Sequence, residues 1–147
     1  MSGTRVEVMH GVNLDTLGGR DPDQYGTFTL PELEATVAGF AAELGLQASF
    51  FQTNHEGEFV EHLHALPERA DALIINAGAW SHYSRAIGDA LEFCGVPAVE
   101  VHISDVSNRE AWRQETVFEG LTIGRIYGKR QDGYREALEL IAEHLKK

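Results

Sequence analysis

The sequence has one cysteine, no long apolar run and no leader-like start, and each shortage excludes a class of protein. A single thiol, Cys94, cannot form an internal disulfide, which is typical of a chain that works in a reducing compartment. No apolar run approaches the roughly 20 residues that a membrane helix needs. Met1 to Arg5 leads directly into a strand-like run, without the apolar segment of a signal peptide. We therefore expect a cytoplasmic protein with no membrane partner.

Basic residues are scarce as well. The chain has 12 lysines and arginines against 23 acidic residues, a formal net charge of −11. Nucleic-acid phosphates require a basic face, so we expect no nucleic-acid partner. Only Lys129, Lys146 and Lys147 are lysines, and the arginines are scattered along the chain. An anionic small-molecule substrate would therefore have to meet a local cluster of arginines.

Signatures of metals and cofactors are also missing. His62 and His64 lie two residues apart in a helical pattern, so they face different ways, and no His-x-x-Glu-His or cysteine-rich spacing occurs. The Gly-x-Gly-x-x-Gly fingerprint of dinucleotide sites does not follow the first strand-like run. Cys94 ends an apolar helical pattern, where packing is a better interpretation than nucleophilic chemistry. We expect neither a metal nor a cofactor.

What is present predicts an alternation of strands and helices. The length of 147 residues, with 43% hydrophobic and 24% charged residues, fits one domain spanning 1–147. Runs of strand length and β-rich content occur at 5–9, 46–51, 72–75, 98–103 and 121–127. Helical patterns lie between them, at 29–45, about 56–66, about 82–93, a short one near 108–114, and one from about 132.

Residues at the ends of these patterns support the assignment. Thr29 and Glu32 have the spacing of a capping box, and Gly45 closes the same helix. Pro67 stops the second helix and Gly95 the third. Five βα units of this kind imply an α/β fold with an open parallel sheet and helices on both faces. The flavodoxin-like strand order 2-1-3-4-5 is the expected one.

Polar residues gather where the predicted strands end. In open parallel sheets, ligands bind outside the carboxyl ends of the strands. One such cluster could be turn chemistry, but four at the same edge favour a site. These clusters are residues 10–13, 52–57, 76–82, and 100–104 with Arg109 and Arg113 downstream.

The connection from 13 to 29 is long for a βα loop. It contains three glycines and a proline, so it can hinge around a stiff middle, and it carries Arg20 and Tyr25. A mobile lid at about 18–28, bearing an arginine and a tyrosine, is one way to close over an anion. The alternative is an ordinary surface loop.

Several of these stretches together resemble type II 3-dehydroquinate dehydratases. They are 11–26 (GVNLDTLGGRDPDQYG), 52–57 (QTNHEG), 75–79 (INAGA), 100–104 (EVHIS) and 109–113 (REAWR), and the similarity runs from about 6 to 134. The resemblance implies a lyase that eliminates water in the anti sense from 3-dehydroquinate, giving 3-dehydroshikimate through an enolate, in the shikimate or quinate pathway. It also implies a homo-oligomer, a dodecamer built from trimers.

The resemblance further implies roles for single residues. Tyr25 is similar to the base that takes a proton beside the ketone, with Arg20 as its activator and Asn13 as the residue that positions a water near the enolate. His102 is similar to the general acid, with Glu100 beside it. Other positions resemble substrate contacts: Asn76, Ile103 and Ser104 for the carboxylate, His82 and Arg113 for ring hydroxyls, and Asp89 for a neighbouring subunit's site.

The implied chemistry is physically reasonable. A free tyrosine has a pKa of roughly 10 and is a poor base at neutral pH, but a neighbouring arginine favours its phenolate. Residues two apart on a strand share a face, so Glu100 can lie beside His102 and favour its protonated form. Base and acid would come from different elements on opposite sides of the bound ring, as an anti elimination requires.

Two alternatives stay open at this stage. One is a non-enzymatic flavodoxin-like module, although a receiver domain would have acidic residues where His10, Asn13 and Asn76 stand, and the first turn is too short for a flavin phosphate. The other is a divergent relative that acts on, or only binds, a related cyclic hydroxy-acid. Asp105 favours it, because this acidic residue follows the carboxylate-binding positions.

Overall fold

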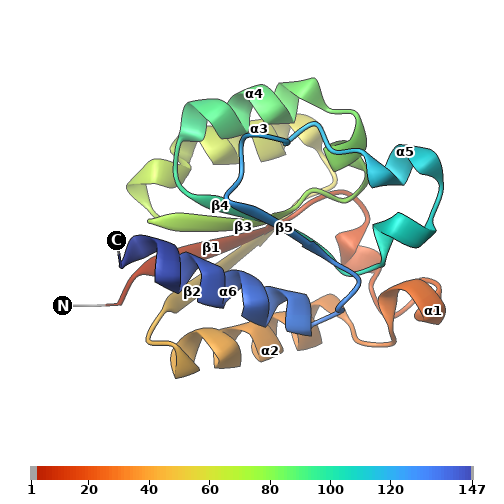
Figure 1. Cartoon of the computed structure of the whole chain (residues 1–147), viewed down its shortest axis with the longest axis horizontal. Helices are drawn as coiled ribbons and strands as arrows, with labels where there is room; N and C mark the ends of the chain where they lie inside the picture. Colours follow the sequence, from red (N-terminus) through yellow and green to blue (C-terminus); the bar gives the residue numbers. More distant parts are fainter. Residues whose placement is uncertain (1–2, 147) are drawn as a thin grey trace.

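Five parallel strands form one open sheet in the order β2-β1-β3-β4-β5, which confirms the predicted topology. The computed structural model describes residues 3–146 (Figure 1). The strands are β1 (Arg5–His10), β2 (Gln47–Gln52), β3 (Ala72–Asn76), β4 (Ala98–His102) and β5 (Gly124–Tyr127). The helices are α1 (Pro22–Tyr25), α2 (Leu30–Glu43), α3 (Glu56–Ala65), α4 (Arg85–Cys94), α5 (Ala111–Gln114) and α6 (Asp132–Leu145).

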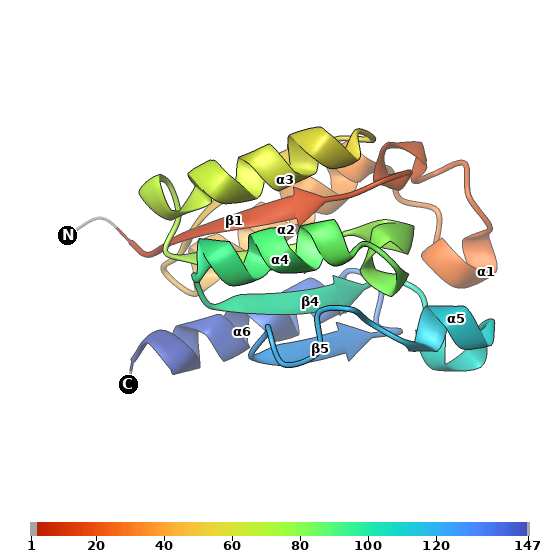
Figure 2. The ribbon, with the colours of Figure 1, turned by 90° about the horizontal axis from the view of Figure 1, so that it is seen from above.

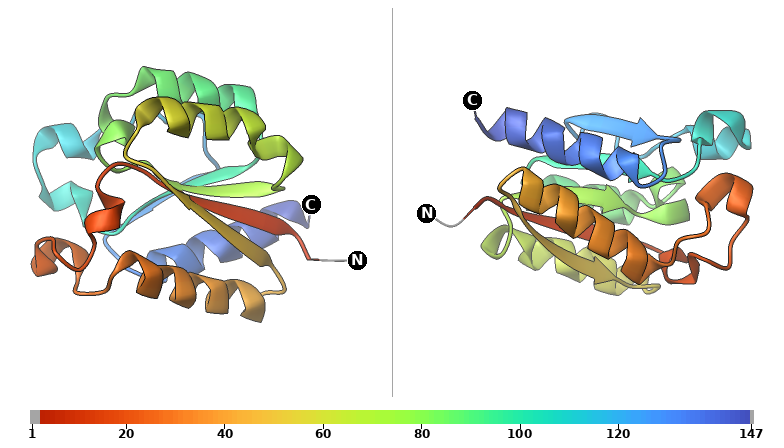
Figure 3. Two further views of the ribbon diagram at one scale, coloured as in Figure 1. Left: turned by 180° about the vertical axis from the view of Figure 1, so that it is seen from behind. Right: turned by 90° about the horizontal axis from the view of Figure 1, so that it is seen from below.

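Helices cover both faces of the sheet, as the alternation of patterns predicts. The helices α2 and α6 lie side by side on one face, and α3 and α4 pack together on the other (Figure 3). Each face has its own buried core, because side chains alternate along each strand. Every residue of β3 and β4 is buried, so the middle of the sheet is enclosed on both sides. In residues 3–146, no helix combines the length and the apolar character needed to cross a membrane.

Short-range chemistry explains most helix ends. The Thr29 hydroxyl accepts from the Glu32 amide, and the Glu32 carboxylate accepts from the Thr29 amide, which is the predicted capping box of α2. Gly45 and Gly95 follow α2 and α4 with φ of 73°, a conformation in which glycine is favoured. Glu56 begins α3, so its place at a helix start is confirmed.

Local contacts explain two of the boundaries at which the prediction and the structure differ. The third helix was expected from about 82 but starts at Arg85, because the Ser84 hydroxyl accepts from the Ile87 amide and caps the helix there. The preceding residues form a separate 3₁₀ turn, η3 (Gly78–His82), which leaves His82 at the end of a turn. The fifth strand was expected from 121 but starts at Gly124, since Leu121 closes a turn onto Phe118 and packs against the α3–α4 core.

The connections after β1, β3 and β4 converge at one edge. These are the 3₁₀ turn η1 (Leu14–Thr16) with α1, then η3, then the 3₁₀ turn η4 (Val106–Asn108) with α5. All lie beyond the carboxyl ends of the strands (Figure 2). The fold therefore places the polar clusters of the sequence beside one another.

Candidate active site

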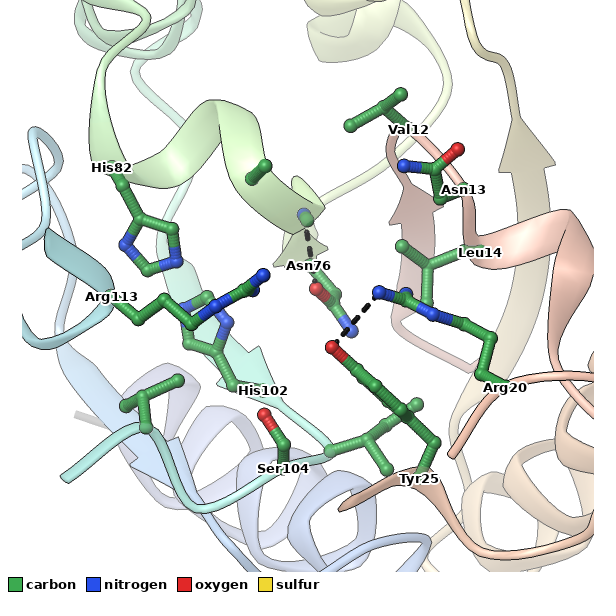
Figure 4. Close-up of a pocket in the computed structure, with 14 residues that line it drawn as sticks. Val12, Asn13, Leu14, Arg20, Tyr25, Asn76, His82, His102, Ser104 and Arg113 are labelled. Atoms are coloured by element: carbon green, nitrogen blue, oxygen red, sulfur yellow. Dashed lines mark hydrogen bonds between the residues drawn. The ribbon is translucent and has the colours of Figure 1, made fainter. Parts of the chain in front are cut away.

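A small cavity of about 70 Å³ lies beyond the carboxyl edge of the sheet. Tyr25 and Arg20 approach it from one side, and His82, His102 and Arg113 from the other (Figure 4). Two predicted site residues do not line it, namely Glu100, which lies behind His102, and Asp89, which is exposed on α4. The structure brings nine of the predicted site residues into this cavity: Asn13, Arg20, Tyr25, Asn76, His82, His102, Ile103, Ser104 and Arg113.

The Tyr25 hydroxyl is held between two arginines. It accepts from Arg20 Nη2 at 3.0 Å and from Arg109 Nη1 at 2.6 Å. The Arg20 guanidinium also lies 3.9 Å from the centre of the Tyr25 ring. Tyr25 is only 8% exposed, so these two cations act on its oxygen with little water between them. Two charged donors thus converge on the hydroxyl oxygen of a residue that lines the cavity.

Arg109 is the residue that sequence reasoning missed. It stands in a matched stretch and beyond a strand end, but no role was assigned to it. Its side chain joins two residues that line the cavity, because the same Nη1 that binds Tyr25 also donates to Ser104 Oγ at 3.1 Å. The signal that the sequence offered was its place in the 109–113 stretch, beyond the end of a strand. The contact itself joins residues 84 positions apart.

His102 and Glu100 form a buried pair on β4. His102 Nε2 lies 2.6 Å from Glu100 Oε2, as expected for neighbours two apart on one face of a strand. Glu100 is 1% exposed and has two further partners: Thr116 Oγ1 donates to its other oxygen at 2.9 Å, and Arg125 Nε lies 3.6 Å away. The Glu100 carboxylate, itself held by these partners, fixes the orientation of the His102 imidazole.

The Asn76 amide is held by two neighbours. Its Nδ2 donates to the Tyr134 hydroxyl at 3.2 Å, and its oxygen accepts from the Gly78 amide at 3.2 Å. Burial raises the pKa of Tyr134 to about 12, so this hydroxyl stays neutral near pH 7. The second Nδ2 hydrogen of Asn76 remains available for a ligand in the cavity. Tyr134 lies on α6, 58 positions away, and sequence reasoning gave it no part in the site.

His82 is oriented by a backbone carbonyl. Its Nδ1 lies 2.7 Å from the Glu115 oxygen, and because a carbonyl only accepts, Nδ1 carries the hydrogen. Burial lowers the pKa of His82, which the Glu115 contact opposes only in part. The neutral ring therefore has its other nitrogen, Nε2, free to accept a hydrogen bond from a hydroxyl.

Tight backbone contacts hold the first turn in place. A Cβ on Gly11 would lie 2.3 Å from the Ala77 oxygen, so only glycine allows the turns after β1 and β3 to touch. Asn13 adopts the left-handed conformation, with φ of 70°. Its backbone N–H donates to Asn54 Oδ1 at 2.8 Å. Asn54 also donates to Asp15 at 3.1 Å. The 52–57 stretch thus braces the turn that presents Asn13.

The charge of Asp105 is directed away from the cavity. Its carboxylate caps η4, accepting from the Ser107 amide at 3.1 Å, the Ser107 hydroxyl at 2.5 Å and Asn108 Nδ2 at 2.9 Å. Asp105 is not among the cavity-lining residues. The turn itself thus supplies the partners of this carboxylate. Among residues 3–146, no three His, Cys, Asp or Glu side chains are grouped as a metal site would require.

Fold and site together define an α/β protein built for acid–base chemistry on a small anion. This class rests on two features that meet at one edge of the parallel sheet: a tyrosine bound by arginines, and a buried histidine next to a carboxylate. The sequence model described as "Dehydroquinase class II" matches residues 4–142. The chain belongs to this family.

This chain is similar to 3-dehydroquinate dehydratases both in sequence and in three-dimensional structure. A 3-dehydroquinate dehydratase of Pelobacter propionicus is 50% identical over 142 residues, covering 96% of this chain and 95% of its own length. The type II dehydroquinase of Propionibacterium acnes superposes with a TM-score of 0.91 at 37% identity, covering 96% and 97% of the two chains. That of Butyrivibrio crossotus also gives a TM-score of 0.91, at 32% identity and 96% and 99% coverage.

Proposed function

We propose that this protein is a type II 3-dehydroquinate dehydratase, a hydro-lyase that converts 3-dehydroquinate into 3-dehydroshikimate. Membership of the class II dehydroquinase family and the names of its relatives support this activity. The observation that carries it here is the Tyr25 hydroxyl, which lies between Arg20 and Arg109 in the cavity that His102 lines from the other side.

The elimination proceeds in two proton transfers. The Tyr25 phenolate removes a proton from the carbon beside the ketone, and the electrons of that bond form an enolate. Asn13 positions a water that stabilises the enolate oxygen. His102 then protonates the departing hydroxyl, which leaves as water while the enolate collapses to the conjugated enone. Each proton transfer by a positioned side chain accelerates such a reaction by about 10²- to 10⁴-fold. The steps need no metal or organic cofactor.

The remaining side chains hold the substrate. Asn76, Ile103 and Ser104 receive the carboxylate, through the Asn76 amide and the backbone of the strand end. His82 accepts from a ring hydroxyl at Nε2, and Arg113, whose guanidinium lies over the Trp112 ring at 4.2 Å, donates to another. Arginine on a planar aromatic side chain loses little freedom when it binds, which favours precise contacts.

Residues 18–28 act as a lid on this site, within one catalytic domain that spans 1–147. The cavity of about 70 Å³ is small beside the roughly 300–1,000 Å³ of ordinary ligand pockets. A six-membered ring with its carboxylate therefore requires the lid to open before it enters. The lid carries both Arg20 and Tyr25, so closure completes the base.

The protein assembles as trimers within a dodecamer and works in the cytoplasm, on the pathway that makes or degrades shikimate precursors. Asp89 is exposed on α4 and outside the cavity of its own chain, which leaves its carboxylate available to a neighbouring subunit. A groove of about 740 Å³, lined by His82, Arg85 and Arg125 among others, opens beside the cavity and offers a concave surface to a neighbouring subunit. Cys94 is a free, buried thiol, which suits a reducing compartment.

The experiment is a spectrophotometric assay with 3-dehydroquinate that follows the conjugated enone product. We expect the initial rate of the absorbance increase to be proportional to enzyme concentration. The absorbance should become constant when the reaction reaches equilibrium. Binding of 3-dehydroquinate without product, measured by calorimetry on the same preparation, would contradict the proposal and favour a relative that only binds. The family match and the names of the relatives support turnover over binding alone.

Tyr134→Phe is expected to weaken substrate binding more than turnover. Without the hydroxyl, Asn76 Nδ2 loses its buried acceptor, which costs about 1–3 kcal/mol of folding free energy and frees the amide to turn. We expect KM for 3-dehydroquinate to rise several-fold with a smaller change in kcat, and urea unfolding to show the loss of stability. Tyr83→Phe, at an exposed tyrosine outside the cavity, is the matched control. An unchanged KM together with unchanged stability would remove Tyr134 from this role.

A further inference from the structure

The lid, residues 18–28, has little internal support. Its only helix, α1, is a single turn whose backbone hydrogen bonds run from the Tyr25 amide to Asp21 and from the Gly26 amide to Pro22. One turn of helix is not stable in water by itself, because nucleation is unfavourable and there is no propagation to offset it. The closed position of the lid therefore depends on contacts with the rest of the protein.

One such contact comes from the loop between β5 and α6. Arg130 Nη2 donates to the Pro22 oxygen at 3.2 Å and to the Asp23 oxygen at 3.3 Å, across more than 100 positions of sequence. Its methylene chain lies beside Gly26, because a Cβ added to that glycine would be 3.6 Å from Arg130 Cδ. The guanidinium thus meets the carbonyls of the helix that presents Tyr25.

The backbone of this loop is anchored to the end of β4. The Arg130 amide donates to the Ile103 oxygen at 3.3 Å, and the Gly128 amide to the Ser104 oxygen at 3.0 Å. Arg130 itself has φ of 51°, an unfavourable conformation for a residue with a side chain, which persists only where the surroundings impose it. The loop therefore holds the Arg130 side chain toward α1 from the strand end that carries Ile103 and Ser104.

The strength of this contact suits a part that opens and closes. Arg130 is exposed, so water and salt screen its charge and each hydrogen bond is weak enough to break during turnover. Tyr25, by contrast, is buried and bound by two arginines. The lid should therefore open first at the Arg130 contact with α1 and only then at the contacts of Tyr25 with Arg20 and Arg109.

We propose that Arg130 is a positioning residue that latches the lid closed and so holds the Tyr25 hydroxyl between Arg20 and Arg109. It acts through the carbonyls of α1 and touches no substrate. The latch links the base to the carboxylate-binding end of β4, so an anion seated at Ile103 and Ser104 stabilises the loop from which Arg130 closes the lid. This assignment rests on the proposed function for its effect on turnover, but not for its effect on the motion of the lid.

The test compares Arg130→Met with Lys129→Met. Methionine keeps an unbranched apolar chain beside Gly26 and removes both hydrogen bonds. Lys129 is exposed and pairs with Glu136, so its replacement removes the same charge from the same loop. We expect amide hydrogen exchange in 18–28 to become about five- to tenfold faster in Arg130→Met alone, with the urea midpoint unchanged. Equal exchange in the two variants would overturn the latch.

Turnover gives a second, separate readout. In Arg130→Met, kcat/KM is expected to fall about five- to tenfold, and Arg130→Lys, which keeps a charge and donors, should recover part of the loss. On a Tyr25→Phe background, Arg130→Met should change the residual rate no further, because the latch acts only through Tyr25. Additive losses would contradict the proposal. Faster exchange in a protein that never turns over 3-dehydroquinate would leave the latch standing and reject the proposed activity.

Discussion

Tyr25→Phe is expected to lower kcat by about 10²- to 10⁴-fold while 3-dehydroquinate still binds. The substitution removes one oxygen, the atom on which Arg20 and Arg109 converge, and leaves the ring that packs beneath the Arg20 guanidinium. The carboxylate and hydroxyl contacts are untouched, so the loss falls on turnover. Steady-state kinetics give kcat, and calorimetric titration of the variant with 3-dehydroquinate gives the affinity.

Tyr127→Phe is the matched control. That tyrosine also has an arginine near its ring, Arg125 at 5.5 Å from the centre, but it is partly exposed and outside the cavity. The Tyr127→Phe variant should turn over 3-dehydroquinate at the rate of the unaltered protein. If the two variants were equally active, Tyr25 would not be the base.

His102→Asn is expected to lower kcat by a similar factor for a different reason. Asparagine cannot protonate the departing hydroxyl, but Glu100 keeps Thr116 and Arg125 as partners, so the carboxylate is not left unpaired. We expect the variant to fold, which circular dichroism and urea unfolding check. His64→Asn, at an exposed histidine of α3, should have normal turnover.

Hydrogen exchange into the substrate separates the two roles. In D₂O, His102→Asn should still exchange the proton beside the ketone of 3-dehydroquinate, because Tyr25 can form the enolate and return a deuteron. Tyr25→Phe should lose this exchange together with elimination. Proton NMR of the substrate follows the signal directly. Exchange that persists in Tyr25→Phe and disappears in His102→Asn would reverse the assignment of base and acid.

Most of the fold could be predicted because its signals are local. The capping box at Thr29 and the glycine after α2 act within a few residues, so they are readable in sequence. The strand order followed from the connection rules of βα units rather than from any single residue. The boundaries that were wrong, at Ser84 and at Leu121, depend on a cap and a turn that compete with a longer helical or strand pattern.

The candidate site could be predicted in part. The edge of the sheet and the short-range pair of Glu100 and His102 follow from period-two geometry on one strand. The partners of Asp105 could not be predicted, because they are the donors of Ser107 and Asn108 in the turn that follows. Arg109 was passed over, since nothing in a linear pattern says which of nearby arginines reaches a given tyrosine.

The sequence by itself determined the class of fold, the edge at which chemistry occurs and the residue types available there. Only the tertiary structure decided which cations surround Tyr25, what orients Asn76, and which loop closes on α1. The physical reason is the separation in sequence between the residues that make each contact. Caps, turns and strand faces are set by neighbours a few positions apart, whereas Arg109 and Arg130 meet the lid across 84 and 107 positions, through contacts that exist only once the chain has folded.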